Sequence, residues 1–267
     1  MRERFLQDIL RNRHNRAILE RWDALALPDG WLVAGCLFQT VWNLRSGRAP
    51  EAQIKDYDLF YFDAGDLSEE AERQVQRHVD AQLAELGITV EAANQARVHL
   101  WYEAHFGHPY SPLHSVTEGI DRFLVPATCV GVRPLAGGWE VYAPHGLPLL
   151  YEGRLAPNPL VDHPALFEAK AASYAERWPW LHASDVDKLM TQLHGLVDAG
   201  NTVIVVEHDM RVVAGADWVI DVGPGAGDAG GRIVAAGTPA EVAARDDSRT
   251  AAFLRTQLPT GVSRSPR

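Results

Sequence analysis

The sequence is poor in lysine. Only three of its 267 residues are lysines, Lys55, Lys170 and Lys188, and none of them follows a glycine. A P-loop requires GxxxxGK followed by Ser or Thr, because its backbone amides and its lysine together cradle the phosphates. The sequence therefore excludes a P-loop in this chain.

Cysteine and long apolar runs are also scarce. The two cysteines, Cys36 and Cys129, form no CxxC pair, which excludes a zinc module built on paired cysteines. Such cysteine usage is typical of a reducing compartment, so we expect a cytoplasmic protein. The chain has no run of about 18 apolar residues, so we expect no membrane span. Its first 22 residues are charged and lack the apolar core of a secretory signal.

Basic charge is in deficit, with 25 basic against 35 acidic residues and a net charge of −10. A strongly acidic chain is a poor non-specific binder of nucleic acid. The composition does not exclude a local basic groove, because arginines are spread along the sequence. The composition, 46% hydrophobic and 22% charged, is typical of a globular protein. The length allows one large domain or two small ones.

Up to residue 181, the local patterns predict a sheet with flanking helices. Residues 1–26 carry an apolar stripe typical of a helix or helix pair. The stretch "WLVAGCLFQTVWNLR" begins as a strand, passes a small-residue turn and continues as a helix, while "IKDYDLFYFD" and "ITVEAANQ" are predicted strands. Between these strands we expect a helix with Ser68 as N-cap and Gly87 at its end. Further on, the patterns predict a short helix at "SVTEGIDRF", strands at "ATCVGVR" and "GGWEVY", and a helix ending at Pro179.

Two aspartates stand two residues apart in the strand "KDYDLFYFD". Side chains at positions i and i+2 of a strand point to the same face, so Asp56 and Asp58 should lie side by side among apolar residues. Adjacent carboxylates repel each other unless a positive charge neutralises them. Two carboxylates on one strand face are suitable ligands for Mg²⁺.

The order of strand, small-residue turn, helix and Asp-x-Asp strand resembles the nucleotidyltransferase superfamily of the polymerase-β type. Ala34-Gly35-Cys36 stands for its glycine turn, and Asp56-Tyr57-Asp58 for its acidic pair. The segments "AGCLFQTVWN", "IKDYDLFYFD" and "NQARVHLWY" are closer still to bacterial nucleotidyltransferase family proteins. The resemblance covers about residues 5–181 and implies a mixed sheet with flanking helices.

The resemblance implies roles for three carboxylates. Asp56 and Asp58 would hold Mg²⁺, which bridges the oxygens of a nucleoside triphosphate. Glu91, on the neighbouring predicted strand, would deprotonate or orient the acceptor hydroxyl. The alternatives are a solvated strand edge for the aspartate pair and a surface strand position for Glu91.

The same resemblance implies a nucleotide-binding set at Gly35, Cys36, Asn94 and Arg97. A glycine turn lets the backbone approach the phosphates, and the helix after it offers free N–H groups. Two departures from the superfamily pattern stand out. Cys36 replaces the usual Ser or Gly, which removes a hydroxyl, and the interval from Gly35 to Asp56 is longer than is common.

The pattern changes after residue 181. The stretch "ASDVDKLMTQLHGLVDAGN" is a predicted amphipathic helix, and "TVIVVEHD" and "ADWVIDVGPG" are predicted strands of a buried parallel sheet. "GGRIVAAGTPAEVAA" is predicted to form a short strand, a turn and a helix capped at Thr238-Pro239. Residues 259–267 are predicted to be a disordered tail.

Residues 181–258 resemble the C-terminal end of the A subunit of the bacterial UvrABC excinuclease, a DNA-damage-recognising ATPase of the ABC class. By this resemblance, Asp185 lies in the loop after the Walker B strand, and His208 is the switch histidine that contacts the γ-phosphate. The sequence has no "LSGGQ"-like signature, and no "DEP" precedes His182. Without these parts and a P-loop, we expect no ATPase activity.

We therefore predict an α/β (α+β) protein: a nucleotidyltransferase-like domain over 1–181, then a partial ABC-ATPase α/β segment over 182–258. The expected function is Mg²⁺-dependent transfer of a nucleotidyl group from an NTP to an unknown acceptor. Two alternatives are a non-catalytic repair-associated fragment, with excinuclease subunits or DNA as partners, and a module that binds a nucleotide without reacting. The two patterns meet abruptly near residue 181. This abrupt change fits a true fusion, a deletion that merged two genes, or a sequence-assembly artefact.

Overall fold

A computed structural model describes residues 1–161, 163–183, 185–223 and 231–258. The chain divides into two compact units, which we call unit 1 (Met1–Ala183) and unit 2 (Ser184–Arg267). Among the described residues, no helix is both long enough and apolar enough to cross a bilayer. The predicted tail, 259–267, lies outside the described residues.

Unit 1 is built on a five-stranded mixed sheet in the order β3-β2-β1-β4-β5. β2 and β3 are parallel, and the other neighbouring strands are antiparallel. The strands are β1 (Trp31–Val33), β2 (Asp56–Tyr61), β3 (Thr89–Asn94), β4 (Gly131–Leu135) and β5 (Gly138–Tyr142). The predicted mixed sheet is confirmed.

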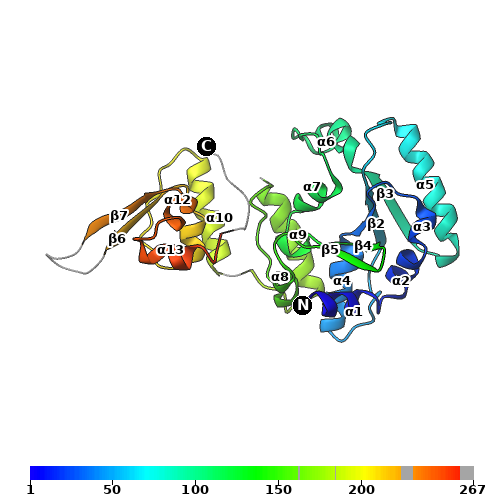
Figure 1. The fold of residues 1–267 in the computed structure, drawn as a ribbon, viewed down its shortest axis with the longest axis horizontal. Coiled ribbons are helices and arrows are strands. Elements are labelled where there is room, and N and C mark those ends of the chain that lie inside the picture. The colour runs from blue at the N-terminus through cyan, green and yellow to red at the C-terminus, as the bar shows by residue number, and fades with distance from the viewer. Residues whose placement is uncertain (162, 184, 224–230, 259–267) are drawn as a thin grey trace. The chain divides into compact units, whose positions relative to one another are not determined.

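Nine α-helices of unit 1 are described around this sheet (Figure 1). They are α1 (Arg2–Ile9), α2 (Arg13–Glu20), α3 (Trp22–Leu25), α4 (Gly35–Arg45), α5 (Glu69–Leu83), α6 (Val98–Phe106), α7 (Val116–Asp121), α8 (Leu147–Glu152) and α9 (Pro164–Arg177). Short 3₁₀ turns are η1 (Ala84–Leu86), η2 (Gln95–Arg97) and η3 (Pro126–Thr128). As predicted, the Ser68 side chain caps α5, and the helical segment ends at Gly87, which adopts a left-handed conformation after η1 has extended α5 by one turn.

The two faces of the sheet are covered differently. The odd positions of β2 point into the main core, where Tyr57 and Leu59 pack with Val79 of α5. The even positions point to the opposite face, where Val116 of α7 belongs to a smaller cluster. Figure 1 shows α5 and α7 on opposite sides of the sheet. Because the smaller cluster leaves part of its face open, polar side chains at even positions of β2 stay accessible.

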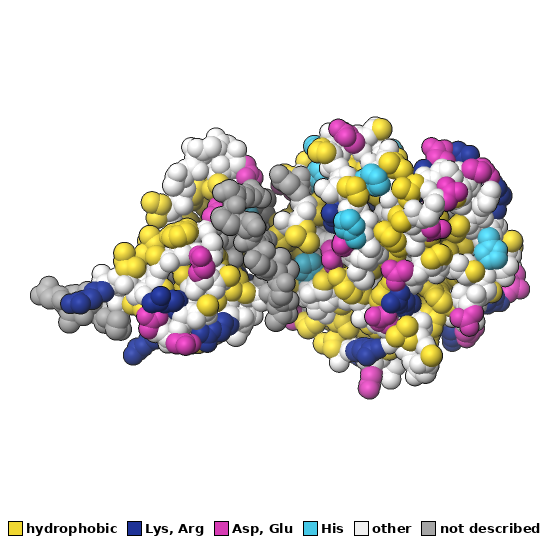
Figure 2. All heavy atoms as spheres, turned by 45° about the horizontal axis from the view of Figure 1, so that its top comes forward, with side chains coloured by type: hydrophobic (Ala, Val, Ile, Leu, Met, Phe, Trp, Pro, Cys, Tyr) yellow, Lys and Arg dark blue, Asp and Glu magenta, His cyan; other side chains and the backbone are white. Residues whose placement is uncertain are grey.

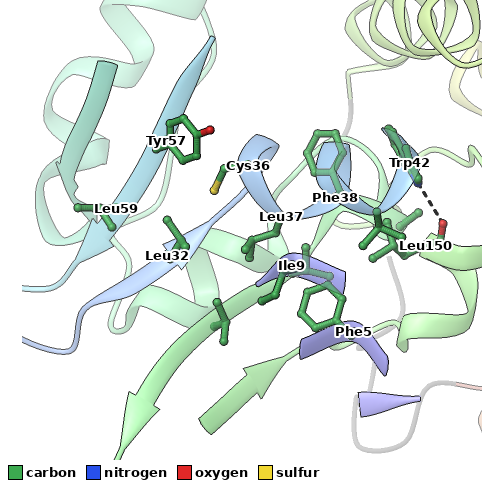
Figure 3. Close-up of a cluster of buried hydrophobic side chains, with 14 of the residues drawn as sticks. Phe5, Ile9, Leu32, Cys36, Leu37, Phe38, Trp42, Tyr57, Leu59 and Leu150 are labelled. Carbon is green, nitrogen blue, oxygen red and sulfur yellow. Dashed lines mark hydrogen bonds between the residues drawn. The ribbon is translucent and has the colours of Figure 1, made fainter. Parts of the chain in front are cut away.

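The main core fixes α4 against the sheet and against the N-terminal helix α1. Phe5 and Ile9 of α1 lie beside Leu37 of α4, and Leu32 of β1 points toward the same cluster (Figure 3). The Trp42 indole N–H donates a hydrogen bond of 3.0 Å to the carbonyl of Leu150 in α8. The start of α4, directly after β1, is therefore held rigidly beside β2.

Unit 2 contains a two-stranded sheet of β6 (Val219–Gly223) and β7 (Arg232–Gly237). Its helices are α10 (Asp185–Asp198), α11 (Met210–Ala214), α12 (Pro239–Ala243) and α13 (Arg249–Leu254). Thr238 and Glu241 form a reciprocal capping box at α12, with Pro239 in its first turn. The helix predicted at Thr238-Pro239 is therefore confirmed.

The prediction of two buried parallel strands in unit 2 is wrong. Residues 201–209 form no strand, and Ile204 and Val206 are 88% and 99% exposed. β6 pairs with β7 in the antiparallel sense and leaves Ile220 and Val222 exposed. A buried parallel strand needs neighbours on both sides and helices over both faces. The described residues of unit 2 supply only two strands, so the apolar run at 202–206 has no sheet to join.

Candidate active site

The structure brings the three predicted carboxylates to one face of the sheet. Asp56 and Asp58 occupy even positions of β2, and both are partly exposed. Glu91 of β3 is the Cα partner of Asp58 in the parallel register and is exposed. Paired residues of neighbouring strands point to the same side, so Glu91 lies on the acidic side of the sheet.

The predicted small-residue turn lies against this face. Val33 pairs with Asp58, so the Ala34-Gly35 turn follows directly beside the carboxylate. Ala34, the N-cap of α4, has φ 60° and ψ −134°, a backbone conformation that L residues rarely adopt. At Gly35, a Cβ atom would approach the Gln39 side-chain nitrogen to 2.7 Å. A larger residue at this position would therefore displace the end of the Gln39 side chain, whereas the unusual backbone conformation of the turn lies at Ala34.

The Cys36 thiol is fully buried and donates to the carbonyl of Val33. Burial, together with the nearby charge of Asp58, raises the pKa of this thiol well above its usual range. The thiol therefore stays protonated at neutral pH, and a neutral buried thiol is not a nucleophile.

Burial and like charges also act on Asp58. Burial first, then the charges of Asp56 and Glu91, raise the pKa of Asp58 to about 7. Lys170 and the backbone amide of Gly35 act in the opposite direction and lower it. The acidic face therefore lacks enough positive charge from the protein itself to hold Asp58 fully ionised at neutral pH.

A pocket of about 600 Å³ opens beside Asp56. Its lining combines one carboxylate with three cationic side chains and several polar ones, namely Gln39, Gln53, Ile54, Lys55, Asp56, Lys170, Ser173 and Arg177. Of the predicted site residues, only Asp56 lines this pocket. The sequence interpretation missed Lys170, Ser173 and Arg177, which are spaced i, i+3 and i+7 along α9 and so share one helix face.

Aromatic packing fixes α9 against α4 and so positions the cations. Trp42 of α4 contacts Tyr174 of α9 and Trp178, the residue directly after α9, each with ring centroids 5.2 Å apart. The Trp178 indole N–H donates to Asn43 at 2.9 Å. On the pocket side, the Arg177 guanidinium lies 4.5 Å from the centre of the Trp178 ring and donates to Gln39 at 3.2 Å. A cation held over an aromatic face is pre-organised for an anion.

Asn94 and Arg97 lie elsewhere. The Asn94 side chain exchanges hydrogen bonds with the backbone of Asp63, at 3.0 and 2.8 Å, and caps η2. Arg97 is buried and forms an ion pair with Glu72 of α5. The Asn94 side chain thus ties the end of β3 to the segment after β2, and Arg97 ties η2 to α5. Neither is among the pocket-lining residues.

In unit 2, the His208 side chain is fully exposed, and its described neighbour is the carboxylate of Glu207. Asp185 begins α10, and its side chain lies outside what the structure describes. The glycine-rich stretch over 224–230 also lies outside the described residues.

The donor set suits Mg²⁺ in chemistry. Carboxylate oxygens on one strand face are the ligands that this ion prefers, and the raised pKa of Asp58 indicates negative charge that a cation would neutralise. Among the described residues, no group of three or more His, Cys, Asp or Glu side chains lies close enough to hold a metal ion. The fit therefore rests on the pair Asp56 and Asp58.

A family model described as Nucleotidyltransferase matches residues 20–183. The chain therefore belongs to this nucleotidyltransferase family, and the resemblance predicted for unit 1 is confirmed. A solved NMR structure described as a CCA-adding enzyme head domain has a TM-score of 0.56. The two are 24% identical, over 68% of this chain and 95% of that chain, and this similarity shows a shared fold.

Curated relatives match a C-terminal region of the chain, which confirms the second resemblance. UvrABC system protein A of Paracoccus denitrificans is 54% identical over 78 residues, covering 29% of this chain and 71% of that sequence. UvrABC system protein A of Thermus thermophilus is 64% identical over 74 residues, 28% of this chain. The chain spans only 8% of the Thermus thermophilus protein and 8% of the Rickettsia conorii protein.

Proposed function

We propose that unit 1 transfers a nucleotidyl group from a nucleoside triphosphate to an acceptor hydroxyl, with a divalent metal ion. The observation that carries this proposal is the placement of Asp56 between two kinds of charge. On one side lie the carboxylates of Asp58 and Glu91, and on the other a pocket with Lys55, Lys170 and Arg177. A metal–triphosphate complex needs both.

In this proposal the cationic residues bind the triphosphate, and the acidic residues hold the metal ion. Lys55, Lys170 and Arg177 bind the triphosphate oxygens, and the packing of Arg177 on Trp178 limits its freedom before the ligand arrives. Asp56 and Asp58 would hold Mg²⁺, which when bound neutralises charge on the reacting phosphate. Cys36 remains a buried neutral thiol behind them.

In the transfer, the acceptor oxygen forms a bond to the α-phosphorus while the bond from that phosphorus to the bridging oxygen of the pyrophosphate breaks. Glu91 is exposed beside Asp58, where it accepts the proton of the acceptor hydroxyl and passes it to solvent. Pyrophosphate leaves through the pocket lined by Lys170 and Arg177.

The test uses the full chain with each of the four NTPs, labelled at the α-phosphate, in Mg²⁺ buffer with a cell extract as acceptor pool. Label transfer should be lost in Asp56→Asn and in Asp58→Asn. The matched control is Asp80→Asn, an exposed carboxylate on α5. The proposal is wrong if both site variants label as well as the control and bind NTP with the same Mg²⁺ dependence.

Unit 2 supports a second proposal. Its identity to UvrABC system protein A favours a non-catalytic, repair-related fragment that binds excinuclease subunits or DNA. ATP hydrolysis is not expected, because the sequence lacks a P-loop and His208 faces solvent. Pull-down of excinuclease subunits and of DNA by the full chain tests this proposal, and failure of both would exclude it.

A further inference from the structure

A row of aromatic side chains begins beside the acidic face. Phe60 occupies an even position of β2, two residues beyond Asp58, and therefore points to the same face. Its ring contacts Phe123 with centroids 5.8 Å apart. The residue before Phe123, Arg122, places its guanidinium 4.5 Å from the centre of the Tyr110 ring. The neighbouring residues Arg122 and Phe123 thus connect the ring pair at β2 with Tyr110.

Helix α6 continues this series of contacts. The Tyr102 ring lies 4.3 Å from Tyr110 and 4.6 Å from Phe106, and Trp101 lies 6.0 Å from Tyr102, all between ring centroids. We define the aromatic row as Phe60, Phe123, Arg122, Tyr110, Tyr102, Phe106 and Trp101.

The outer end of the aromatic row is open to solvent. Val98 is the one buried residue of α6, although the helix also carries Leu100, Trp101 and Phe106, which are exposed. Exposed apolar patches of this kind mark interaction sites. Figure 2, with the α6 side of Figure 1 turned forward, shows hydrophobic and histidine side chains gathered on this face of unit 1.

Flat rings interrupted by a guanidinium are suited to nucleobases. Unpaired bases stack on aromatic side chains and on arginine planes regardless of sequence. Duplex binding depends instead on many phosphate contacts, and this chain has a net charge of −10, with Glu103 on α6 and Glu118 on α7. The charge balance therefore favours an unpaired strand held by stacking.

We propose that the aromatic row binds the unpaired bases of a single-stranded nucleic acid and directs its terminal hydroxyl toward Glu91. Base stacking on Trp101, Phe106 and Tyr102 provides the affinity, and Arg122 provides a cationic plane within the row. The acceptor role rests on the proposed nucleotidyl transfer, whereas the stacking itself does not.

The test measures binding of a fluorescein-labelled 12-nucleotide single-stranded RNA, and of the same sequence as a duplex, to the full chain by anisotropy. The single strand should bind and the duplex should not. Between 50 and 200 mM salt, affinity should fall by roughly threefold, as expected for about one phosphate contact. Trp101→Ala should weaken binding roughly 5- to 150-fold, the usual effect of losing one stacked base.

Two control variants make the result decisive. Trp218→Ala removes a tryptophan that is 61% exposed in unit 2 and should leave RNA affinity unchanged. Asp58→Asn should bind the RNA as the native chain does even where label transfer is lost. RNA affinity therefore tests the stacking proposal, and label transfer tests the nucleotidyl transfer proposal, so the failure of one can be told from the failure of the other. Absent binding, equal duplex binding, or equal weakening by Trp101→Ala and Trp218→Ala would overturn the inference. So would self-association that depends on Trp101 while RNA affinity does not.

Discussion

Replacing Asp58 with asparagine should make the folded protein more stable at pH 8 in metal-free buffer. The pKa of Asp58 is raised from 3.8 to about 7 in the folded state, mainly by burial and then by Asp56 and Glu91. Ionising this group therefore costs folding free energy that an uncharged amide of the same shape does not.

The size of the effect follows from the shift of the pKa. A difference of about three units, at 1.36 kcal/mol per unit, corresponds to roughly 4 kcal/mol as an upper bound. Asp58 is partly exposed, so solvent screens its neighbours, and we expect about 2 kcal/mol. This is several times the usual effect of a surface substitution.

The direction of the pKa shift of Asp58 determines the pH range over which the stability changes. Below pH 3.8, the folded and the unfolded chain both carry the proton, so the favourable contribution of protonated Asp58 is fully present. As pH rises from about 4 to about 7, the folded state keeps a proton that the unfolded state has lost, so the contribution falls. Above about 7 it is gone. Asp58→Asn should remove this slope.

The assay is urea denaturation followed by tryptophan fluorescence, at pH 4 to 8 with a chelator present. Asp80→Asn, exposed on α5, serves as the control and should keep the native slope. The reasoning is refuted if Asp58→Asn keeps the native pH slope, or if it is less stable than the native chain at pH 8.

Four further outcomes are expected. Ala34→Gly should stabilise unit 1 by about 1 kcal/mol in urea, because glycine adopts the backbone conformation at φ 60° without strain. Trp42→Phe should destabilise it by about 2 kcal/mol in the same assay, because the bond to the Leu150 carbonyl is lost and a void is left. Added Mg²⁺ should raise the melting temperature of the native chain but not that of Asp58→Asn. The native chain should self-associate in analytical ultracentrifugation through its exposed apolar run at 202–206, and Ile204→Ser should reduce this without lowering stability, because the Ile204 side chain is 88% exposed.

The sequence predicted those parts of the site that depend on local pattern. The turn at Ala34-Gly35 and the alternation around Asp56 and Asp58 are properties of short segments, and the structure places them side by side through the pairing of Val33 with Asp58. The sheet and its flanking helices could be predicted for the same reason, since period-2 and period-3.6 patterns are local.

The basic wall of the pocket could not be predicted in this way. Lys170 and Arg177 reach Asp56 only because α9 packs against α4, more than 120 residues earlier, through Trp42 and Trp178. The spacing of Lys170 and Arg177 around Tyr174 was a usable signal, because it places both cations beside an aromatic residue on one helix.

The error in unit 2 has a different cause. A short apolar run such as 202–206 is compatible with a buried strand, but the strand forms only where neighbours supply its hydrogen bonds. The described residues of unit 2 provide β6 and β7 alone, and these pair with each other. The sequence pattern therefore indicates the kind of sheet into which such a segment packs, namely a buried parallel sheet. The described residues of unit 2 contain only two strands, so they do not form a sheet of that kind.

Helix α9 also sets an order of events during synthesis. Asp56, Asp58 and Glu91 emerge from the ribosome long before Lys170 and Arg177, and until α9 packs on α4 only Lys55 of the three pocket cations lies beside them. Three carboxylates with one lysine leave a net negative surface, which attracts a nucleoside triphosphate poorly. The proposed binding of NTP therefore reaches its full strength only when α9, the last helix of unit 1, docks and adds two cations.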